Sequence, residues 1–164
     1  MPNIQVTYLE LREPTPAPTQ RPERVTRERL NIDDYLALYR KVGERLRWDQ
    51  RLRMPEADLA SLLASENLHL YVLRNAGGNA LGFCELDGSS FPEIEIKNFG
   101  LVPEAQGRGL GPWLLSAALH EEWKSNPSRI WLHTDTWDHP SAISVYQRAG
   151  FKIYAVREED SDPL

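Results

Sequence analysis

A glycine-rich run at the start of a helical pattern constrains the fold of this chain more than any other feature. The polar run Pro103–Gly111 contains three glycines, and an apolar helical pattern begins near Gly109 and continues to about Lys124. Pro112 falls in the first turn of that helix, where its missing N–H costs nothing. Successive backbone N–H groups and a helix N-terminus attract anions, and glycines let a phosphate approach the backbone. The run therefore predicts an anion-binding loop.

Two common phosphate-binding loops do not fit this run. A P-loop requires a Lys followed by Ser or Thr after its glycines, and no such pair follows here. A dinucleotide fingerprint requires a third glycine, whose position falls on Leu114 when counted from Gly109 and on Pro112 when counted from Gly107. A plain turn that starts a helix is the alternative that the glycines alone leave open.

Strands and helices are predicted to alternate along one domain of 164 residues. Alternating residues over Glu93–Lys97 are typical of a strand, with Glu95 on the face opposite Ile94 and Ile96. The other strands that we expect are Ile4–Leu11, Val25–Leu30, Leu68–Arg74, Ala80–Asp87, Arg129–Thr134 and Phe151–Val156. Further helices are expected after Asn31 as N-cap, over Pro55–Ser65, and over Pro140–Ala149 with Asp138 or His139 as N-cap and Gly150 beyond its end. This order predicts an α/β mixed sheet flanked by helices.

Both ends of the domain carry distinctive segments. Residues 1–30 combine a strand with a proline-rich loop or extended arm over Glu13–Arg24. Residues 158–164 form an acidic tail that we expect to be frayed. The short C-terminal region leaves a sheet edge that a partner in a homodimer could cover.

Composition argues against several classes of function. The formal net charge is −5, whereas a nucleic-acid-binding domain usually has a basic face. No apolar run approaches the length of a membrane span, and the N-terminus has no secretory pattern. The single cysteine, Cys84, excludes a disulfide within the chain and fits a reducing compartment, and we interpret it as a core residue. We therefore expect a soluble cytoplasmic protein that binds neither nucleic acid nor membrane.

Two segments resemble the GNAT superfamily of N-acetyltransferases. Phe99–Gly111 is similar to motif A, V-x-P-x-x-[RQ]-x-x-G-x-[GA], with Val102, Pro103, Gln106, Gly109 and Gly111 in register. His139–Phe151 is similar to motif B, N-x-x-A-x-x-x-Y-x-x-x-G-F, although His139 stands where the family usually has Asn. The resemblance covers about residues 68–156, and its two motifs have the correct order and separation.

The resemblance implies a central, mostly antiparallel sheet with a parallel pair at the cofactor site. It implies acetyl-CoA as cosubstrate and no metal. The backbone of Leu101 and Val102 would pair with the pantetheine amides, as an added strand does. His139 would replace the Asn that contacts the pantetheine arm, would serve only as an N-cap, or would indicate a shifted site. The pyrophosphate would be held by the N–H groups of the loop, at Gln106, Gly107, Arg108, Gly109, Leu110 and Gly111.

Acylation of an amine requires a base for the ammonium and an acid for the departing thiolate. Tyr146 matches the motif-B tyrosine, which acts as general acid toward the CoA sulfur, and the alternative is an ordinary residue on an apolar helix face. Glu95 stands at the same offset before Gln106 as the basic glutamate of the histone-acetyltransferase branch. His133 and Asp135 are second choices, and a water relay is also possible in this family.

The acceptor pocket is expected after the first helix, where arginines surround Trp48. Arg51 or Arg53 could hold an acceptor carboxylate, or this stretch could be a solvated helix with charge pairs. Pocket or core positions near the strand end are Trp131, Trp137 and Asp138. The leading interpretation is an enzyme, an acetyl-CoA-dependent N-acetyltransferase that acts on a small amine in a ternary complex. Alternatives are acetylation of a protein N-terminus or lysine, a non-catalytic CoA-binding module, and a pure interaction domain.

Overall fold

The helices and strands lie close to their expected positions in a computed structural model that describes residues 3–46, 48–136, 138–139 and 141–160. The strands are β1 Asn3–Leu11, β2 Arg24–Arg27, β3 Leu68–Arg74, β4 Ala80–Asp87, β5 Glu93–Leu101, β6 Arg129–Asp135 and β7 Lys152–Asp160. The helices are α1 Ile32–Gly43, α2 Gln50–Arg53, α3 Glu56–Ala64, α4 Leu110–Glu122 and α5 Ala142–Arg148.

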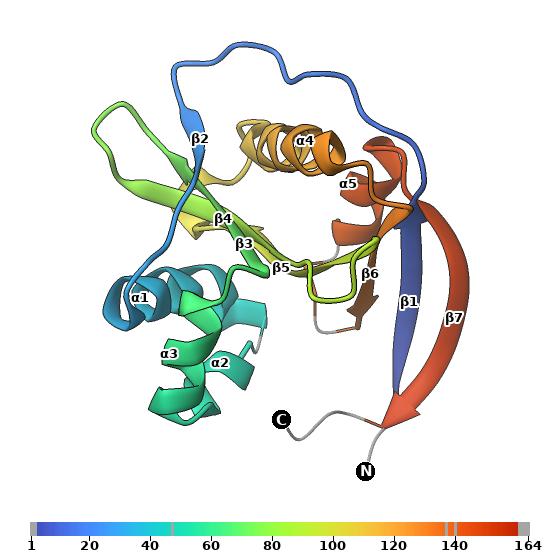
Figure 1. Cartoon of the computed structure of the whole chain (residues 1–164), viewed down its shortest axis with the longest axis horizontal. Helices are drawn as coiled ribbons and strands as arrows, with labels where there is room; N and C mark the ends of the chain where they lie inside the picture. The colour runs from blue at the N-terminus through green and yellow to red at the C-terminus, as the bar shows by residue number, and fades with distance from the viewer. Residues whose placement is uncertain (1–2, 47, 137, 140, 161–164) are drawn as a thin grey trace.

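The strands form one sheet in the order β2-β3-β4-β5-β6-β1-β7. The β5–β6 pair is parallel, and the other neighbouring pairs are antiparallel. Helices α1, α2 and α3 lie on one side of the sheet, and α4 and α5 lie on the other (Figure 1). This arrangement confirms the expected mixed sheet with one parallel pair.

The sheet opens between β5 and β6. Parallel pairing joins Glu93–Glu95 to Arg129–Trp131 and extends no further among the described residues. Strand β5 also contains a bulge, because Glu85 lies opposite Asn98 whereas the next residue, Leu86, lies opposite Ile96. A bulge bends a strand and changes which side chains face each side of the sheet. The two parallel strands therefore separate in the region where the cavity described below begins.

Helix α4 supplies the core on its side of the sheet. Its apolar rows follow the expected helical spacing, and Leu110, Leu114, Leu115, Ala118 and Leu119 are fully buried. On the same face of β5, Ile94 and Ile96 are buried, as the alternation predicts. On the opposite side of the sheet, α1 begins at the expected cap, where the Asp34 N–H donates to Asn31 Oδ1 at 2.8 Å.

Two expectations for the C-terminal region are wrong. Helix α5 has Ser141 at its N-cap, not Asp138 or His139, because the Asp138 carboxylate already accepts bonds from Thr134, Asp135 and Trp48. The tail is not frayed from residue 158, since residues 158–160 end β7 and pair with the start of β1. Expectations that fall on Trp137, Pro140 and residues 161–164 lie outside the described residues.

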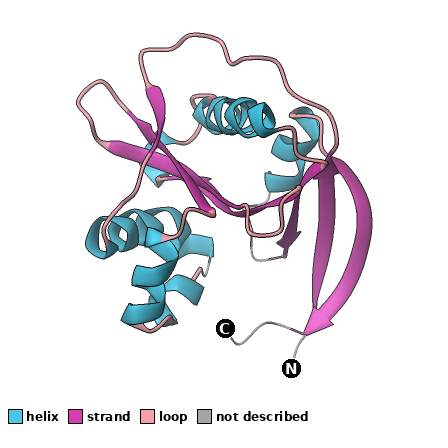
Figure 2. Cartoon of the chain, viewed as in Figure 1, coloured by secondary structure: helices cyan, strands magenta, loops and turns pink. Residues whose placement is uncertain are grey.

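Strand β7 is an edge of the sheet, with Ile153 and Val156 exposed. Coverage of this edge by a second copy stays a prediction. At the other edge, β2 is shorter than the expected Val25–Leu30. The long segment between β1 and β2 passes over α4 (Figure 2). None of the helices within the described residues has the length and apolarity that crossing a membrane requires.

Candidate active site

A cavity of about 490 Å³ lies between the separated strands β5 and β6. Its walls come from β5, from β6, from the glycine-rich loop before α4, and from α5. Eight of the residues predicted to bind the cofactor line it: Leu101, Gln106, Gly107, Gly109, Leu110, Gly111, His139 and Tyr146. Two others, Val102 and Arg108, are not among the lining residues.

The glycine-rich loop presents free backbone donors. Gly107 and Gly109 have φ values of 80° and 74°, a left-handed conformation that favours glycine. The Gln106 N–H donates to the Pro103 carbonyl at 3.2 Å, so it is already used. The N–H groups of Gly107, Arg108 and Gly109 bond to no other group in the part of the chain that the structure describes. The loop therefore offers three donors and the N-terminus of α4.

The space beside the backbone of the glycine-rich loop is open at Gly107. A Cβ atom added at Gly107 would have no heavy atom within 4 Å, so the space beside its backbone is open. Helix α4 has no side-chain cap, since its N-cap residue is Gly109. The first N–H groups of a helix lack partners inside the helix, and the dipole favours an anion there. The loop and the start of α4 thus have the features that the predicted anion site requires, and its ligand stays a prediction.

The hydrogen bonds at the end of β5 distinguish between the two residues predicted to contact pantetheine, Leu101 and Val102. The Val102 N–H donates to the Leu81 carbonyl at 2.8 Å, and the Val102 carbonyl accepts from the Ala105 N–H at 3.0 Å. Both backbone groups of Val102 therefore have partners already. Because backbone groups alternate in direction along an antiparallel strand, those of Leu101 are directed away from β4, toward the cavity. The geometry favours Leu101 as the strand residue that would pair with a pantetheine amide.

Tyr146 lies in the cavity wall, at the end of α5. Its ring packs against Phe99 at 5.7 Å and Phe151 at 5.6 Å between centroids, and only 6% of the residue is exposed. Burial raises the pKa of the Tyr146 hydroxyl well above its ordinary value, and the nearby Cys84 and Asp138 act in the same direction. The hydroxyl is therefore protonated at neutral pH and able to donate a hydrogen bond.

Glu95 and His133 meet on the opposite face of the sheet. Glu95 Oε2 lies 3.8 Å from His133 Nε2, and Glu95 Oε1 lies 3.6 Å from Lys97 Nζ. His133 and Lys97 line the cavity, whereas Glu95 is not among its lining residues and its side chain is 16% exposed. The two predicted base candidates thus form one group, with His133 at the cavity and Glu95 behind it.

Asp135 does not join this group. It lies further along β6, opposite Val6 of β1, and is absent from the cavity lining. His139 lines the cavity, but its Nδ1 is engaged locally, at 3.1 Å from the Ser141 N–H and 2.7 Å from the Ser141 hydroxyl. Its Nε2 makes no hydrogen bond with another residue of the described chain.

Trp48 and Asp138 connect two rims of the cavity. Trp48 follows α1 and lines the cavity, and its Nε1–H donates to Asp138 Oδ1 at 3.4 Å. The indole also packs on Tyr39 and Phe83, at 5.7 and 6.3 Å between ring centroids. Gly43 is required for this packing, because a Cβ there would lie 2.5 Å from Trp48 Cβ. Trp48 therefore lines the cavity and also packs against the aromatic side chains of the core.

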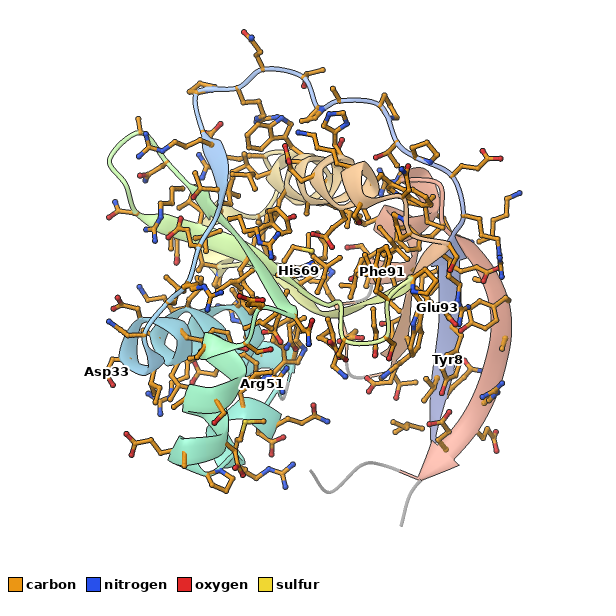
Figure 3. All side chains as sticks on the ribbon, viewed as in Figure 1. Tyr8, Asp33, Arg51, His69, Phe91 and Glu93 are labelled. Atoms are coloured by element: carbon orange, nitrogen blue, oxygen red, sulfur yellow. The ribbon has the colours of Figure 1, made fainter. Side chains whose placement is uncertain are left out.

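Arg51 lies outside the main cavity. Its Nη2 bonds to Glu85 Oε2 at 2.5 Å, and its Nε donates to the Tyr35 hydroxyl at 3.2 Å. Arg51 belongs to α2, and Figure 3 shows it on the side of the sheet that the first helices cover. Arg51 and Glu85 line a second cavity of about 310 Å³, which Lys97 also lines. Arg53 pairs with Asp49 at 3.0 Å on the surface, as the charge-pair interpretation of this stretch expected.

The sequence model of the acetyltransferase (GNAT) family matches residues 30–151 of the chain. The chain belongs to the GNAT acetyltransferase family. The two segments that resemble GNAT motifs, Phe99–Gly111 and His139–Phe151, both contribute residues to the cavity lining.

Curated relatives of this GNAT chain are named mycothiol acetyltransferases. The one from Clavibacter sepedonicus is 31% identical over 137 residues, which are 77% of this chain and 41% of the relative. The one from Pseudarthrobacter chlorophenolicus is 38% identical over 82 residues, which are 47% of this chain and 25% of the relative. The chain spans less than half the length of the curated relatives that it matches.

Solved GNAT structures share the fold. A GCN5-related N-acetyltransferase from Sphaerobacter thermophilus has a TM-score of 0.64 at 20% identity, over 95% of this chain and 50% of that one. An IAA acetyltransferase from Bacillus cereus has a TM-score of 0.59 at 22% identity, over 80% of this chain and 79% of that one.

Sequence reasoning missed Lys97 and Phe99 as residues of the GNAT cavity. Lys97 is the extra residue of the bulge, and Phe99 packs on Tyr146. A signal for both is present in the sequence, because apolar residues occupy positions 94 and 96 and then 99 and 101. A change of phase of this kind is typical of a bulge.

Proposed function

We propose that this chain is an acetyl-CoA-dependent N-acetyltransferase that acts on a primary amine of a small molecule. One observation carries the proposal: a single cavity is lined by a glycine loop with free N–H donors and by Tyr146 and His133, which are groups able to move protons. Membership of the GNAT family supports the same reaction class.

When bound, acetyl-CoA supplies an acetyl thioester that is already activated toward an amine. The residues that would hold it are the N–H groups of Gly107, Arg108 and Gly109 for the pyrophosphate, and the Leu101 backbone for the pantetheine. His139, with Nε2 available, is a further polar contact along this path. No covalent enzyme intermediate is required, and Cys84 is fully buried in the core.

The acceptor amine is an ammonium at neutral pH, since an alkylamine has a pKa near 10.4. His133 would take its proton, and Glu95, 3.8 Å from Nε2, would stabilise the imidazolium that results. The Tyr146 hydroxyl would donate a hydrogen bond or a proton to the departing sulfur. Because its pKa is raised by burial, Tyr146 stays protonated and available as donor at neutral pH.

The cavity favours a small acceptor over a peptide. Trp48 and Asp138 both line the cavity and are joined by a 3.4 Å contact, which supports a small acceptor. The curated relatives, named mycothiol acetyltransferases, also support a small-molecule acceptor. We keep the cytoplasm as the expected compartment, because the one cysteine is a free buried thiol.

The experiment that tests this proposal has two stages. The first measures the melting temperature of the protein with acetyl-CoA, CoA or NADH. A rise with both CoA species and none with NADH is expected, because a ligand that binds only the folded state stabilises it. The second measures thiol release from acetyl-CoA with a panel of small amines and with peptides. Absence of any shift with CoA species at millimolar concentration would refute the cofactor assignment, and turnover of peptides alone would refute the small-molecule acceptor.

A further inference from the structure

The segment of residues 12–23, which we name the N-terminal arm, reaches the glycine loop from outside the family domain. The Trp113 indole N–H donates to the Thr19 carbonyl at 2.6 Å, and Arg21 Nη2 donates to the Arg108 carbonyl at 3.0 Å. Figure 2 shows this loop as it passes over α4. The arm is therefore fixed at two points, one on the first turn of α4 and one on the glycine loop.

The Arg21 guanidinium lies at the surface of the glycine loop. Its Nη1 is 3.7 Å from the position that a Cβ atom would take at Gly109, a residue that lines the cavity. Its Nε faces Glu23 Oε1 at 3.5 Å, and its side chain is 31% exposed. Nη1 makes no hydrogen bond within the part of the chain that the structure describes. A cation with free N–H donors thus stands beside the free N–H groups of the loop.

We propose that Arg21 is an anion-binding residue for the phosphate groups of CoA. This inference rests on the proposed function, since it takes CoA as the ligand of the loop. A guanidinium binds phosphate oxygens by charge-assisted hydrogen bonds. The whole chain has a formal net charge of −5, so a local cation matters for a polyanionic ligand.

The family pattern does not supply this residue. The match to the family begins at residue 30, whereas the N-terminal arm ends before it. Arg21 also contacts the glycine loop directly, because its Nη2 donates to the Arg108 carbonyl. Glu23 competes for the same guanidinium, but it bonds to Nε and the Arg108 carbonyl bonds to Nη2, so Nη1 is the terminal nitrogen left for a ligand.

The test compares Arg21→Gln with Arg24→Gln in the full chain. Both variants remove one positive charge, but Arg24 lies exposed at the start of β2 and has no hydrogen bond or ion pair with the loop among the described residues. Each protein is titrated with acetyl-CoA, with 3′-dephospho-acetyl-CoA and with S-acetylpantetheine, which lacks every phosphate. Melting temperatures without ligand report whether the fold is preserved.

Arg21→Gln should weaken acetyl-CoA binding about three- to tenfold, as loss of a partly exposed charged contact predicts. Arg24→Gln should leave binding unchanged, and Arg21→Lys should restore part of the loss. S-acetylpantetheine should bind both variants as it binds the wild type. If the loss is kept with the 3′-dephospho ligand, Arg21 contacts the pyrophosphate; if it disappears, Arg21 contacts the 3′-phosphate.

Two outcomes would overturn the inference. Equal acetyl-CoA affinity of Arg21→Gln and wild type would show that Arg21 only anchors the N-terminal arm. An equal loss with S-acetylpantetheine would show an indirect effect on the cavity. Failure of the wild type to bind any CoA species would instead refute the proposed function, so the two failures are distinguishable.

Trp113→Phe gives an independent check, because it removes the bond to Thr19 and leaves Arg21 in place. If the arm delivers Arg21 to the phosphates, this variant should also lose affinity for acetyl-CoA, by less than Arg21→Gln. Its affinity for S-acetylpantetheine should not change. Unchanged acetyl-CoA affinity, in a variant shown to have a freed arm by faster proteolysis there, would contradict the arm's role.

Discussion

The Glu95 carboxylate lies 3.8 Å from Nε2 of His133, and of these two residues His133 lines the cavity. If they act as one proton-accepting unit, Glu95→Gln and His133→Gln should each lower kcat roughly 10²-fold, the usual scale of general base catalysis. The double variant should lose little more than either single variant, because residues that act as a unit are not additive. Steady-state kinetics with a saturating amine measures all three.

The matched control for this pair is Glu93→Gln. Glu93 lies on the same face of β5, but its carboxylate pairs with Arg129 at 2.6 Å and its side chain is 47% exposed. Its kcat should stay within about twofold of wild type, as a surface substitution predicts. Fully additive losses in the Glu95 and His133 double variant would contradict a shared role and favour a water relay.

Tyr146→Phe should lower kcat and leave acetyl-CoA affinity nearly unchanged. The substitution removes the hydroxyl group alone, and the ring keeps its contacts with Phe99 and Phe151. We expect a loss of roughly 10²-fold for a missing general acid. The ordinary pKa of tyrosine is about 10, and burial raises the pKa of Tyr146 above it. Ionisation of Tyr146 should therefore cause no loss of wild-type activity up to about pH 10. An unchanged kcat would reduce Tyr146 to a core residue of α5.

Gly107→Ala and Gly78→Ala separate backbone strain from ligand binding. Their φ values are 80° and 84°, and an added Cβ has no neighbour within 4 Å at either position. Both should lose about 1 kcal/mol of stability, since the left-handed conformation disfavours alanine. Only Gly107→Ala should weaken acetyl-CoA binding, because Gly78 lies in the hairpin between β3 and β4. Calorimetric titration of both variants decides this, and equal affinities would remove Gly107 from the anion site.

Arg51 and Glu85 form a buried ion pair whose loss should cost stability. Glu85 is fully buried, and it also accepts from the Tyr35 hydroxyl. Arg51→Met leaves a buried carboxylate without its cation, which typically costs about 3–5 kcal/mol. Adding Glu85→Gln should recover part of that loss, as urea unfolding would measure. If Arg51→Met leaves stability intact but raises KM for the amine, the earlier prediction that Arg51 binds an acceptor carboxylate would gain support.

Local patterns predicted those parts of the fold that depend on neighbouring residues. Strands β3 and β4 have the predicted bounds residue for residue. The glycine-containing turn between them marks where β3 ends and where β4 begins. The loop before α4 could be predicted from its glycines, whose left-handed conformations few other residues adopt. The N-cap of α1 was predicted correctly because Asn31 bonds to a backbone N–H only three positions away.

Long-range pairing could not be predicted from the same patterns. Strand β1 lies between β6 and β7, and no periodicity in Ile4–Leu11 specifies these partners. Residues 158–160 look like part of a solvated acidic tail until β1 provides a strand for them to pair with. In both examples, a partner distant in the sequence decides the outcome. Asp138 is a plausible helix cap by position, but Thr134, Asp135 and the distant Trp48 use its carboxylate.

The pair between Glu28 and Arg74 predicts how stability depends on pH. Arg74 donates from Nε at 2.8 Å and from Nη2 at 2.7 Å, and it thereby joins the residue after β2 to β3. Hydrogen bonding to Arg74 is the main cause that lowers the pKa of Glu28 in the folded state. The ionised carboxylate therefore stabilises the fold above its unfolded pKa of about 4.3, and this contribution is lost as the pH falls through the lower folded-state value.

Glu28→Gln should lower the free energy of unfolding at pH 7 by about 0.5–1 kcal/mol, since both side chains are partly exposed. The difference from wild type should shrink as the pH falls below about 4.3, because protonated Glu28 resembles glutamine. Glu13→Gln, in the exposed N-terminal arm, is the control and should show no difference at either pH. Urea unfolding at pH 7 and at several acidic values measures the trend, and a difference that grows toward low pH would contradict the stabilising role of this ion pair.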